Sequence, residues 1–158
     1  MSDEKQLKQA KTVYKSLCDM LDGRNWHYKR DDEALRIQCG AQGEDLPIDI
    51  MIEIDQKRML VTLLSKMPFT IPENRRKELA VAVSQANNGM VDGSFDYDFL
   101  SGRILFRLTS SYRESLIGKT MLEYMLICSC QTVDDYNDKF LLVAKNNMTV
   151  DEILEFIK

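Results

Sequence analysis

The chain has 158 residues, which suits one domain with enough length for a hydrophobic core. Hydrophobic residues make up 44% and charged residues 29% of the sequence, values typical of folded globular proteins, so extensive disorder is excluded. The formal net charge is −4, so the protein has no global basic field to hold a polyanion, and nucleic acid is not expected as a partner.

The sequence also carries signals about the cellular compartment. The opening segment MSDEKQLKQAK is polar and lacks the apolar stretch of a signal peptide. No run approaches the roughly 18 apolar residues that a membrane span needs. Three of the four cysteines fall on apolar-facing positions of predicted elements, where a free thiol behaves as a small hydrophobic group. We therefore expect a cytoplasmic protein with no membrane partner.

The first predicted element is a helix over residues 3–22. Apolar side chains fall on one stripe at helical spacing, and Gly23 supplies a stop. The stripe contains Leu7, Ala10, Tyr14, Leu17 and Leu21. The next segment, 24–33, is polar and loop-like, and Trp26 and Tyr28 either anchor it or begin an edge strand.

Three strands are expected next. Apolar and polar residues alternate over 35–39, which predicts the first strand. Isoleucines alternate through 48–54, and Pro47 fits the first position of that strand. Residues 55–58 make a turn. The segment 59–64 is apolar on both faces, so we place it in the centre of the sheet.

A second helix is predicted to begin at residues 70–73. Their sequence, Thr-Ile-Pro-Glu, has capping-box spacing, with the proline in the first turn, where its missing N–H costs nothing. The helix runs to about Asn88, and Gly89 ends it. Its inward face carries Leu79, Ala82, Val83 and Ala86.

A hairpin follows this helix. Polar residues alternate with the other residues over 91–99, which predicts a strand with one face in the core. A four-residue loop over 99–102 places the apolar faces of this strand and the next one on the same side of the sheet. In that register Asp98 faces Arg103, and Phe95 faces Phe106.

Two glycines in the hairpin have predicted roles. Gly102 ends the loop, where it is free to adopt a positive φ. Gly93 interrupts an otherwise bulky apolar face, so we expect a helix or another backbone to approach closely there.

The rest of the chain is predicted to be helical. A capping-box pattern at 111–114 opens a long region that reaches about Asn146; residues 132–135 could cap a second piece, so one bent helix and two helices both remain open. Its buried stripe is predicted to contain Ile117, Met121, Tyr124, Met125, Cys128, Val133, Tyr136, Phe140 and Val143. Another capping box at 149–152 begins a short last helix. We expect its inward residues to be Val150, Ile153, Leu154 and Ile157.

This order of elements predicts an α+β fold. The links between strands are short enough for hairpins, so we expect a mostly antiparallel five-stranded sheet with helices packed on one face. The predicted order is α-β-β-β-α-β-β-α, with the short helix added at the end. No linker or internal repeat divides the sequence, so residues 1–158 form a single predicted domain.

The residue pattern does not indicate a catalytic or metal centre. The aspartates within 92–98 are interpreted as the solvated face of a strand, partly neutralised by Arg103 and Arg107. The cysteine pair within 128–130 lacks the two-residue spacing and further ligands of a zinc or redox site. His27 is the sole histidine, which leaves little for a histidine-based triad. We expect no catalytic residues, no metal and no cofactor.

The sequence does offer a candidate interaction surface. Met51 lies on the otherwise polar face of its strand, and Leu60 and Leu64 contribute apolar area to the sheet face opposite the helices. Arg75, Arg76 and Lys77 form the one basic cluster. A solvated helix face is the favoured interpretation of this cluster, and a surface that meets a partner's carboxylates, with Arg75 and Arg76 in it, is the alternative.

Several of these segments together resemble the YbjN family, described as bacterial sensory transduction regulators with the fold of type III secretion chaperones. The resemblance rests on the segments Gln85–Asn88, Gly93–Asp98, Gly102–Arg107 and Pro47–Ile54. It implies a compact acidic homodimer that holds other proteins and has no catalytic residues. Residues 149–158 extend past the third helix expected from this fold.

Two functions are therefore carried forward. The leading hypothesis is a non-enzymatic protein-interaction module, chaperone-like or regulatory, that forms a homodimer and binds a further protein. The alternative is a small-molecule sensor or enzyme with a pocket between the sheet and the C-terminal helices.

Overall fold

The computed structural model describes residues 3–158. They form four α-helices, one 3-10 turn and six strands. In chain order these are α1 (Asp3–Gly23), β1 (Tyr28–Asp31), β2 (Arg36–Gln42), β3 (Pro47–Asp55), β4 (Leu60–Lys66), η1 (Glu73–Arg75), α2 (Arg76–Asn87), β5 (Ser94–Asp98), β6 (Arg103–Ser111), α3 (Lys119–Lys145) and α4 (Val150–Phe156).

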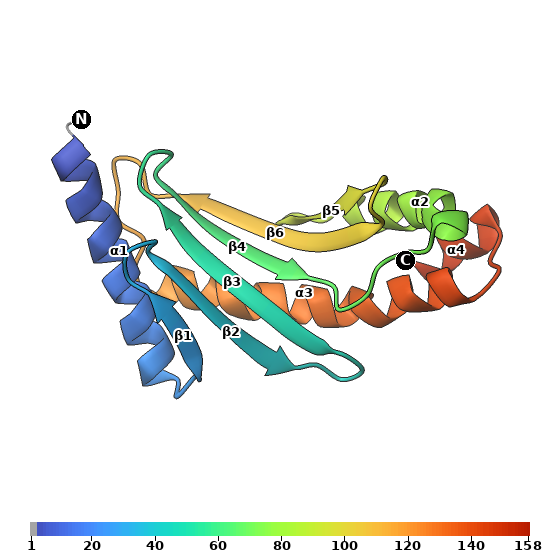
Figure 1. The fold of residues 1–158 in the computed structure, drawn as a ribbon, viewed down its shortest axis with the longest axis horizontal. Coiled ribbons are helices and arrows are strands. Elements are labelled where there is room, and N and C mark those ends of the chain that lie inside the picture. Colours follow the sequence, from blue (N-terminus) through green and yellow to red (C-terminus); the bar gives the residue numbers. More distant parts are fainter. Residues whose placement is uncertain (1–2) are drawn as a thin grey trace.

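The six strands form one sheet in the order β1-β2-β3-β4-β6-β5, and every neighbouring pair is antiparallel. Figure 1 shows α3 running along the sheet behind the strands, with α1 across one end and α2 and α4 at the other. The α+β class and the antiparallel sheet are as predicted, and β4 is central in the sheet, also as predicted.

The prediction of five strands was wrong by one, because β1 forms the edge of the sheet. It pairs with β2, with Tyr28 opposite Cys39 and Asp31 opposite Arg36. Its sequence, Tyr-Lys-Arg-Asp, lacks apolar alternation because an exposed edge strand needs none. The Tyr28 hydroxyl donates to the Asp22 carboxylate at 2.8 Å, which holds β1 against α1.

The β5–β6 hairpin has the predicted register. Phe95 lies opposite Phe106, and Asp98 lies opposite Arg103. Gly102 closes the loop with a φ of 72°, a conformation that glycine adopts without steric cost. This part of the fold therefore follows from local pattern and turn geometry.

The predicted strand 91–99 is shorter in the structure. The chain leaves the sheet at Gly93, whose φ is 78°, and Val91 is exposed instead of facing the core. The predicted close approach at this glycine is confirmed: a Cβ there would lie 2.5 Å from Cζ of Phe106 and 2.7 Å from the carbonyl oxygen of Arg107. The neighbour is β6, so this position requires glycine for both space and conformation.

The predicted capping box at 70–73 is wrong. Pro72 precedes η1 in an extended conformation, no side chain caps this turn, and α2 begins only after it. The cause is tertiary: Ile71 is buried, and its N–H donates to the carbonyl of Gly102 at 2.8 Å. This bond keeps the linker extended beside the β5–β6 loop.

The predicted helix start at 111–114 is also wrong. Ser111 is the last residue of β6, and Tyr112 is buried, with its N–H donating to the Met59 carbonyl and its hydroxyl donating to the Asp55 carbonyl. Glu114 has a φ of 61°, which excludes a right-handed helix there. The segment after β6 is thus held on the β3–β4 turn, and α3 begins later.

The long helical region is one continuous helix, α3, which settles the alternative left open by the sequence. The predicted inward Met121 and Tyr124 are exposed, whereas Leu122 and Leu126 are buried. The buried stripe is rotated around the helix axis relative to the prediction, because α3 has apolar residues on more than one side. Its buried residues are Leu122, Met125, Leu126, Ser129, Val133, Asn137, Phe140 and Val143.

The two terminal helices largely follow the prediction. In α1, Ala10, Tyr14, Leu17 and Leu21 are buried, while Leu7 is exposed. The capping box at 149–152 is present and begins α4. Ile153 and Ile157 of this last segment are buried, but Val150 and Leu154 are exposed, so half of its predicted inward face was wrong.

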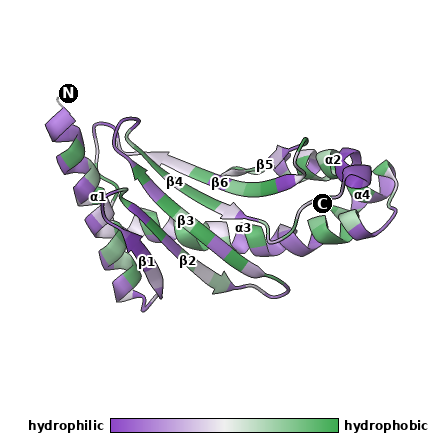
Figure 2. Cartoon of the chain, viewed as in Figure 1, coloured by the Kyte–Doolittle hydropathy of each residue, from purple (hydrophilic) through white to green (hydrophobic). Residues whose placement is uncertain are grey.

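The core lies between the sheet and the helices. Figure 2 shows hydrophobic and hydrophilic residues alternating along the strands, as expected for a sheet that buries one face. Aromatic rings fill the end of the core under β5 and β6: Phe95 packs edge-on against Phe106 and Phe140, with ring centroids 5.3 and 5.0 Å apart. Such pairs add to the stability that area burial alone supplies.

Candidate interaction surface

Successive residues of each strand point to opposite faces of the sheet. Two adjacent rows of paired residues across the strands therefore show the composition of the two faces. A row on the inner face, toward the helices, joins Ile37, Ile52, Leu63 and Leu108, all of them buried. The next row, on the outer face, joins Gln38, Met51, Leu64, Arg107 and Ser94. The outer face is therefore mixed in character, with apolar residues in its middle.

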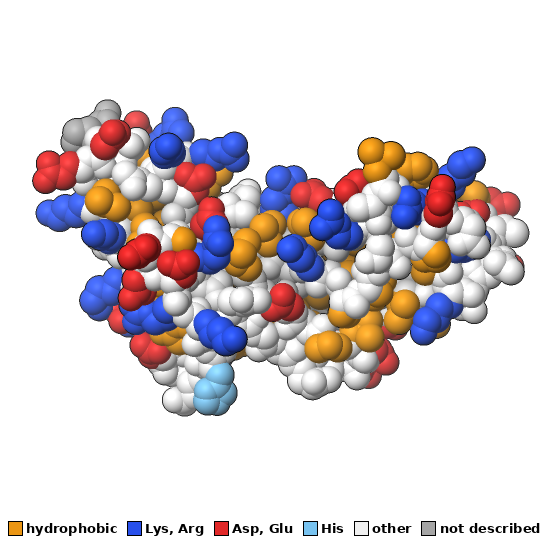
Figure 3. All heavy atoms as spheres, in the orientation of Figure 1, with side chains coloured by type: hydrophobic (Ala, Val, Ile, Leu, Met, Phe, Trp, Pro, Cys, Tyr) orange, Lys and Arg blue, Asp and Glu red, His pale blue; other side chains and the backbone are white. Residues whose placement is uncertain are grey.

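Half-buried apolar side chains gather there. Met51 and Leu64 lie directly opposite each other, and Leu60 is on the same face toward the β3–β4 turn. Leu105 of β6 lies opposite Lys66 and diagonal to Leu64, within side-chain reach. We call Met51, Leu60, Leu64 and Leu105 the outer-face cluster. Figure 3 shows hydrophobic side chains over the middle of the sheet, beside several lysines and arginines.

Ion pairs flank the outer-face cluster on both sides. Arg36 of β2 bonds to Glu53 of β3, with Nε at 2.9 Å from the carboxylate. On the opposite side Arg107 of β6 pairs with Asp96 of β5 at 2.9 Å, as the sequence predicted in part. Exposed pairs of this kind contribute little to stability. Their consequence is that each flank presents one cation and one anion.

A groove of about 610 Å³ opens beside Leu105 at the edge of the cluster. Its floor is β6 near Arg103, and one wall is the linker that follows β4, including Phe69. Asp96 and Asp98 line it from β5. The groove carries both charge signs and therefore extends the mixed character of the outer face.

The two arginines of the predicted surface do not lie in this region. Arg75 is only 8% exposed, and its guanidinium donates to the carbonyls of Val143 and Asn146 at 2.9 and 2.7 Å. It therefore caps the C-terminal end of α3, where the helix dipole favours a cation. Arg76 bonds to carbonyls of the β4–η1 linker and the β5–β6 loop. The expected exposure of Arg75 is wrong, because the residue is part of the packing between helices.

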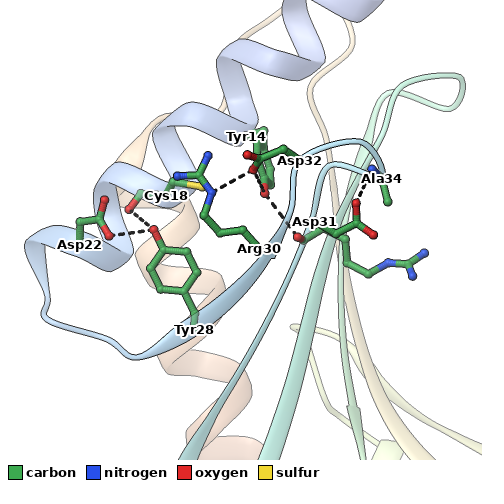
Figure 4. A network of polar contacts seen from close by, with 9 residues as sticks. Tyr14, Cys18, Asp22, Tyr28, Arg30, Asp31, Asp32 and Ala34 are labelled. Atoms are coloured by element: carbon green, nitrogen blue, oxygen red, sulfur yellow. Dashed lines mark hydrogen bonds and ion pairs between the residues drawn. The ribbon is translucent and has the colours of Figure 1, made fainter.

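A polar network joins α1 to β1 and to the turn that follows it (Figure 4). The Tyr14 hydroxyl donates to Asp32 at 2.9 Å, and Nε of Arg30 donates to the same oxygen. The Arg30 guanidinium also lies over the Tyr14 ring. The network thus fixes the position of the edge strand.

The protonation states in this network do not favour catalysis. Burial raises the pKa of the Tyr14 phenol, and the bond to Asp32 raises it further. The Tyr14 and Arg30 bonds hold the pKa of Asp32 below its usual range. Burial raises the pKa of the neighbouring Cys18 thiol. The phenol and the thiol therefore stay protonated near neutral pH, unlike an activated nucleophile.

The interior between the sheet and α3 is packed with apolar side chains. Within residues 3–158, the buried polar or charged side chains are Ser65, Arg75, Ser129 and Asn137. Ser129 donates to the carbonyl of Met125 in its own helix, a common structural arrangement. An interior of this composition does not favour the alternative hypothesis of a polar pocket between the sheet and the C-terminal helices.

Among the described residues, no group of three or more His, Cys, Asp or Glu side chains lies close enough together to hold a metal ion. In that range, no helix combines the length and the apolar character needed to cross a membrane. All four cysteines are free thiols.

Comparison with known proteins finds likeness in structure. No family model matches the chain, and no curated protein matches it in sequence. The crystal structure of YbjN from E. coli matches with a TM-score of 0.57 and 10% identity, over 77% of this chain and 86% of that one. This chain shares the YbjN fold. The fold expected from the segments that resemble that family is thereby confirmed.

Two complexes also match. In the ExsC–ExsE complex the TM-score is 0.58 at 12% identity, over 82% of this chain and 93% of that one. In the HopA1–SchA chaperone–effector complex it is 0.50 at 15% identity, over 89% and 98%. The fold is thus that of the type III secretion chaperones, as the resemblance implied, and at these identities the likeness concerns the fold.

Sequence reasoning missed one member of the outer-face cluster. Leu105 alternates with inward residues of β6 and shares its face with Arg103 and Arg107. The available signal was an apolar residue on an otherwise polar strand face, the same signal that drew attention to Met51.

Proposed function

We propose that this chain is a non-enzymatic protein-binding adaptor that works in the cytoplasm as a homodimer, with the outer-face cluster as the interface between the two copies. The observation that carries the proposal is the placement of Met51, Leu60, Leu64 and Leu105 on the sheet face that the helices leave uncovered. Apolar side chains grouped on a protein surface often mark an interface.

The flanking charges support a second copy as the occupant of this face. A twofold axis parallel to the strands, through the Met51–Leu64 pair, would bring the Arg36–Glu53 flank of one copy over the Arg107–Asp96 flank of the other. Each flank then meets both signs of charge. The net charge of −4 is too small to keep two copies apart at physiological salt, where the Debye length is about 8 Å.

The structural neighbours support the role of holding another protein. Two of them are complexes: ExsC with ExsE, and SchA with HopA1 as a chaperone–effector pair. The packed interior of this chain and its protonated Tyr14 and Cys18 favour binding over catalysis.

Site-specific photocrosslinking tests the interface. With benzoylphenylalanine in place of Met51, irradiation of the purified protein should give a covalent dimer, because the probe lies inside the interface. The matched control carries the probe at Val150, which is exposed on α4, and should give little product. Equal yields at both positions, or no dimer from the Met51 variant, would refute the interface.

The adaptor role is tested by the same variants in cells. Irradiation of the Met51 variant should yield the dimer, and any further protein bound to it should be recovered with that dimer on affinity purification. A wild-type protein recovered alone and monomeric from its native host would contradict the adaptor function.

A further inference from the structure

The loop between β5 and β6 presents two neighbouring apolar side chains to solvent. Leu100 is 85% exposed, and Phe99 is 46% exposed. We call Phe99–Leu100 the hairpin tip. Figure 1 shows this loop at the end of the hairpin, beside α2, and Figure 3 shows hydrophobic side chains protruding at the corresponding place. A leucine that water surrounds so fully contributes almost nothing to the stability of the fold.

The chain nevertheless holds the hairpin tip in an ordered turn. The Asp98 carboxylate accepts hydrogen bonds from the N–H groups of Leu100 at 3.1 Å and of Ser101 at 3.3 Å. The Gly102 N–H donates to the Asp98 carbonyl at 2.7 Å, and Gly102 has the left-handed conformation that closes the turn. The exposure of Leu100 therefore results from a defined backbone conformation.

Two neighbouring segments also fix the loop to the body of the protein. From α2, the Arg76 guanidinium donates to the carbonyls of Leu100 and Ile71. The Ile71 N–H in turn donates to the Gly102 carbonyl at 2.8 Å. A loop that is ordered in advance loses little conformational entropy when its tip enters another surface.

Positive charges surround the hairpin tip. Arg76 contacts the loop from α2, whereas Arg103 and Lys66 lie on the outer face and line the groove of about 610 Å³. Within residues 3–158, none of these three side chains forms an ion pair. Their charges are therefore available to an external anion.

The carboxylates that line the same groove are already engaged. Asp98 lies opposite Arg103 in the ladder, but its oxygens accept the hydrogen bonds of the turn, including one from the Ser101 hydroxyl. These bonds hold the pKa of the Asp98 carboxyl below its usual range. Asp96 forms an ion pair with Arg107 at 2.9 Å. The unpaired charge that these side chains contribute is positive, although the net charge of the chain is −4.

We propose that the hairpin tip binds the surface of a membrane that contains anionic lipids. The two apolar side chains enter the boundary between headgroups and acyl chains, and the three unpaired cations contact lipid phosphates. The arrangement, with apolar residues at the tip and cations behind them, matches the layers of a lipid surface better than it matches a polynucleotide, which would leave Leu100 in water.

This inference goes beyond the adaptor function and does not depend on it. The hairpin tip is not part of the outer-face cluster, so a dimer can form whether or not a membrane is bound. The sequence-based expectation of no membrane partner rested on the lack of an apolar span, which a surface contact does not need.

Co-sedimentation of the full chain with lipid vesicles tests the proposal. The protein should bind vesicles made from equal parts of phosphatidylcholine and phosphatidylglycerol, and far less to vesicles of phosphatidylcholine alone. High salt should weaken the binding, because the Debye length falls to about 3 Å at 1 M.

Substitutions at the hairpin tip should change the binding in both directions. Leu100→Ser should lower the partition coefficient by about tenfold or more, because burial of a leucine side chain supplies at least that factor. Leu100→Trp should raise the partition coefficient, because tryptophan favours the membrane interface. A gain of binding cannot result from partial unfolding of a variant that keeps the melting temperature of the wild type.

Matched variants elsewhere provide the controls. Val91→Ser changes an exposed apolar residue before the other end of β5 and should leave binding unchanged. Arg103→Gln and Lys29→Gln each remove one positive charge, but Lys29 is exposed on β1, at the opposite edge of the sheet. Only Arg103→Gln should weaken binding, by about fivefold. All these side chains are exposed, so the variants should melt with the wild type.

The other outcomes would overturn the proposal. A wild type that stays in the supernatant, or that binds both kinds of vesicle equally, would contradict it. Equal binding by Leu100→Ser and Val91→Ser would place the contact outside the hairpin tip. If the wild type ignores vesicles and a photocrosslinker at Leu100 captures a protein, the occupant is a protein and the lipid surface is refuted. A monomeric wild type that binds the mixed vesicles would count only against the proposed dimer interface.

Discussion

The two faces of the sheet are built from the same strands but meet different surroundings. Leu63 and Leu64 are neighbours on β4, yet Leu63 is 0% exposed on the inner face, while Leu64 is half-buried on the outer face beside Met51. The inner face is covered by this chain's own helices. The apolar residues of the outer face have no such cover within residues 3–158, and this difference is the basis of the proposed interface.

The largest expected effect separates the two faces by stability. Leu63→Ala leaves a cavity in the core and should cost about 2–5 kcal/mol of unfolding free energy. Leu64→Ala should cost less than about 1.5 kcal/mol in the monomer, because the side chain is only half-buried. Urea unfolding at low protein concentration measures both. Equal losses of unfolding free energy in the two variants would mean that the inner and outer faces contribute equally to the stability of the monomer.

A second substitution tests the hydrogen bonds by which the Asn87 side chain occupies the outer edge of β5. Asn87→Ala removes two hydrogen bonds to Phe95 and should cost about 1–3 kcal/mol, since each such bond contributes about 0.5–1.5 kcal/mol. Asn88→Ala, at the exposed neighbour, should stay within about 0.5 kcal/mol.

If the two asparagine variants are equally stable, the Asn87 hydrogen bonds do not stabilise the outer edge of β5. Hydrogen exchange at Phe95 should report the same difference, with faster exchange in Asn87→Ala only.

The sequence predicted those parts of the fold that depend on local pattern. The isoleucine alternation through 48–54 placed β3 and its buried face correctly, because each residue's environment there repeats every second position. The Phe95–Phe106 register also followed, because turn length and side-chain alternation fix it together.

The failures come from long-range contacts that no local pattern reports. Val91 alternates as a strand residue should, but the bonds from Asn87 to Phe95 turn the preceding chain away from the sheet. Ser111 has capping-box spacing, but burial of Tyr112 against the β3–β4 turn keeps Ser111 in the strand as its last residue.

The candidate surface shows the same division. Met51 and Leu64 were predictable as apolar residues facing away from the helices, and the structure places them side by side. Arg75 was not predictable, because its role depends on the C-terminal carbonyls of α3, which are distant in sequence.

Unfolding at alkaline pH tests how completely the inner face of the sheet excludes water. Burial raises the pKa of Cys39 from an ordinary value of 9.0 to about 12. Between these values the folded state holds a proton that the unfolded state releases, so stability is complete below pH 9 and falls as pH rises toward 12. The loss from this thiol should reach about 2.7 kcal/mol at pH 11.

Cys39→Val is the matched variant, since valine has similar size and does not ionise. Urea unfolding at pH 8 and at pH 11 should show a smaller loss of stability in this variant than in the wild type. Identical losses would indicate that water reaches the thiol, and the inner face would then not be dry at β2.

The smallest expected effect on folding belongs to Leu64→Lys, and its effect on association is the most direct test of the central claim. Light scattering after size exclusion at tens of micromolar should give the wild type a mass of twice 18.3 kDa. The Leu64→Lys variant should run as a folded monomer of 18.3 kDa, because a charge in the outer-face cluster cannot be buried without a partner. A monomeric wild type, or a Leu64→Lys variant that remains a dimer, would contradict the assignment of the outer face as the interface.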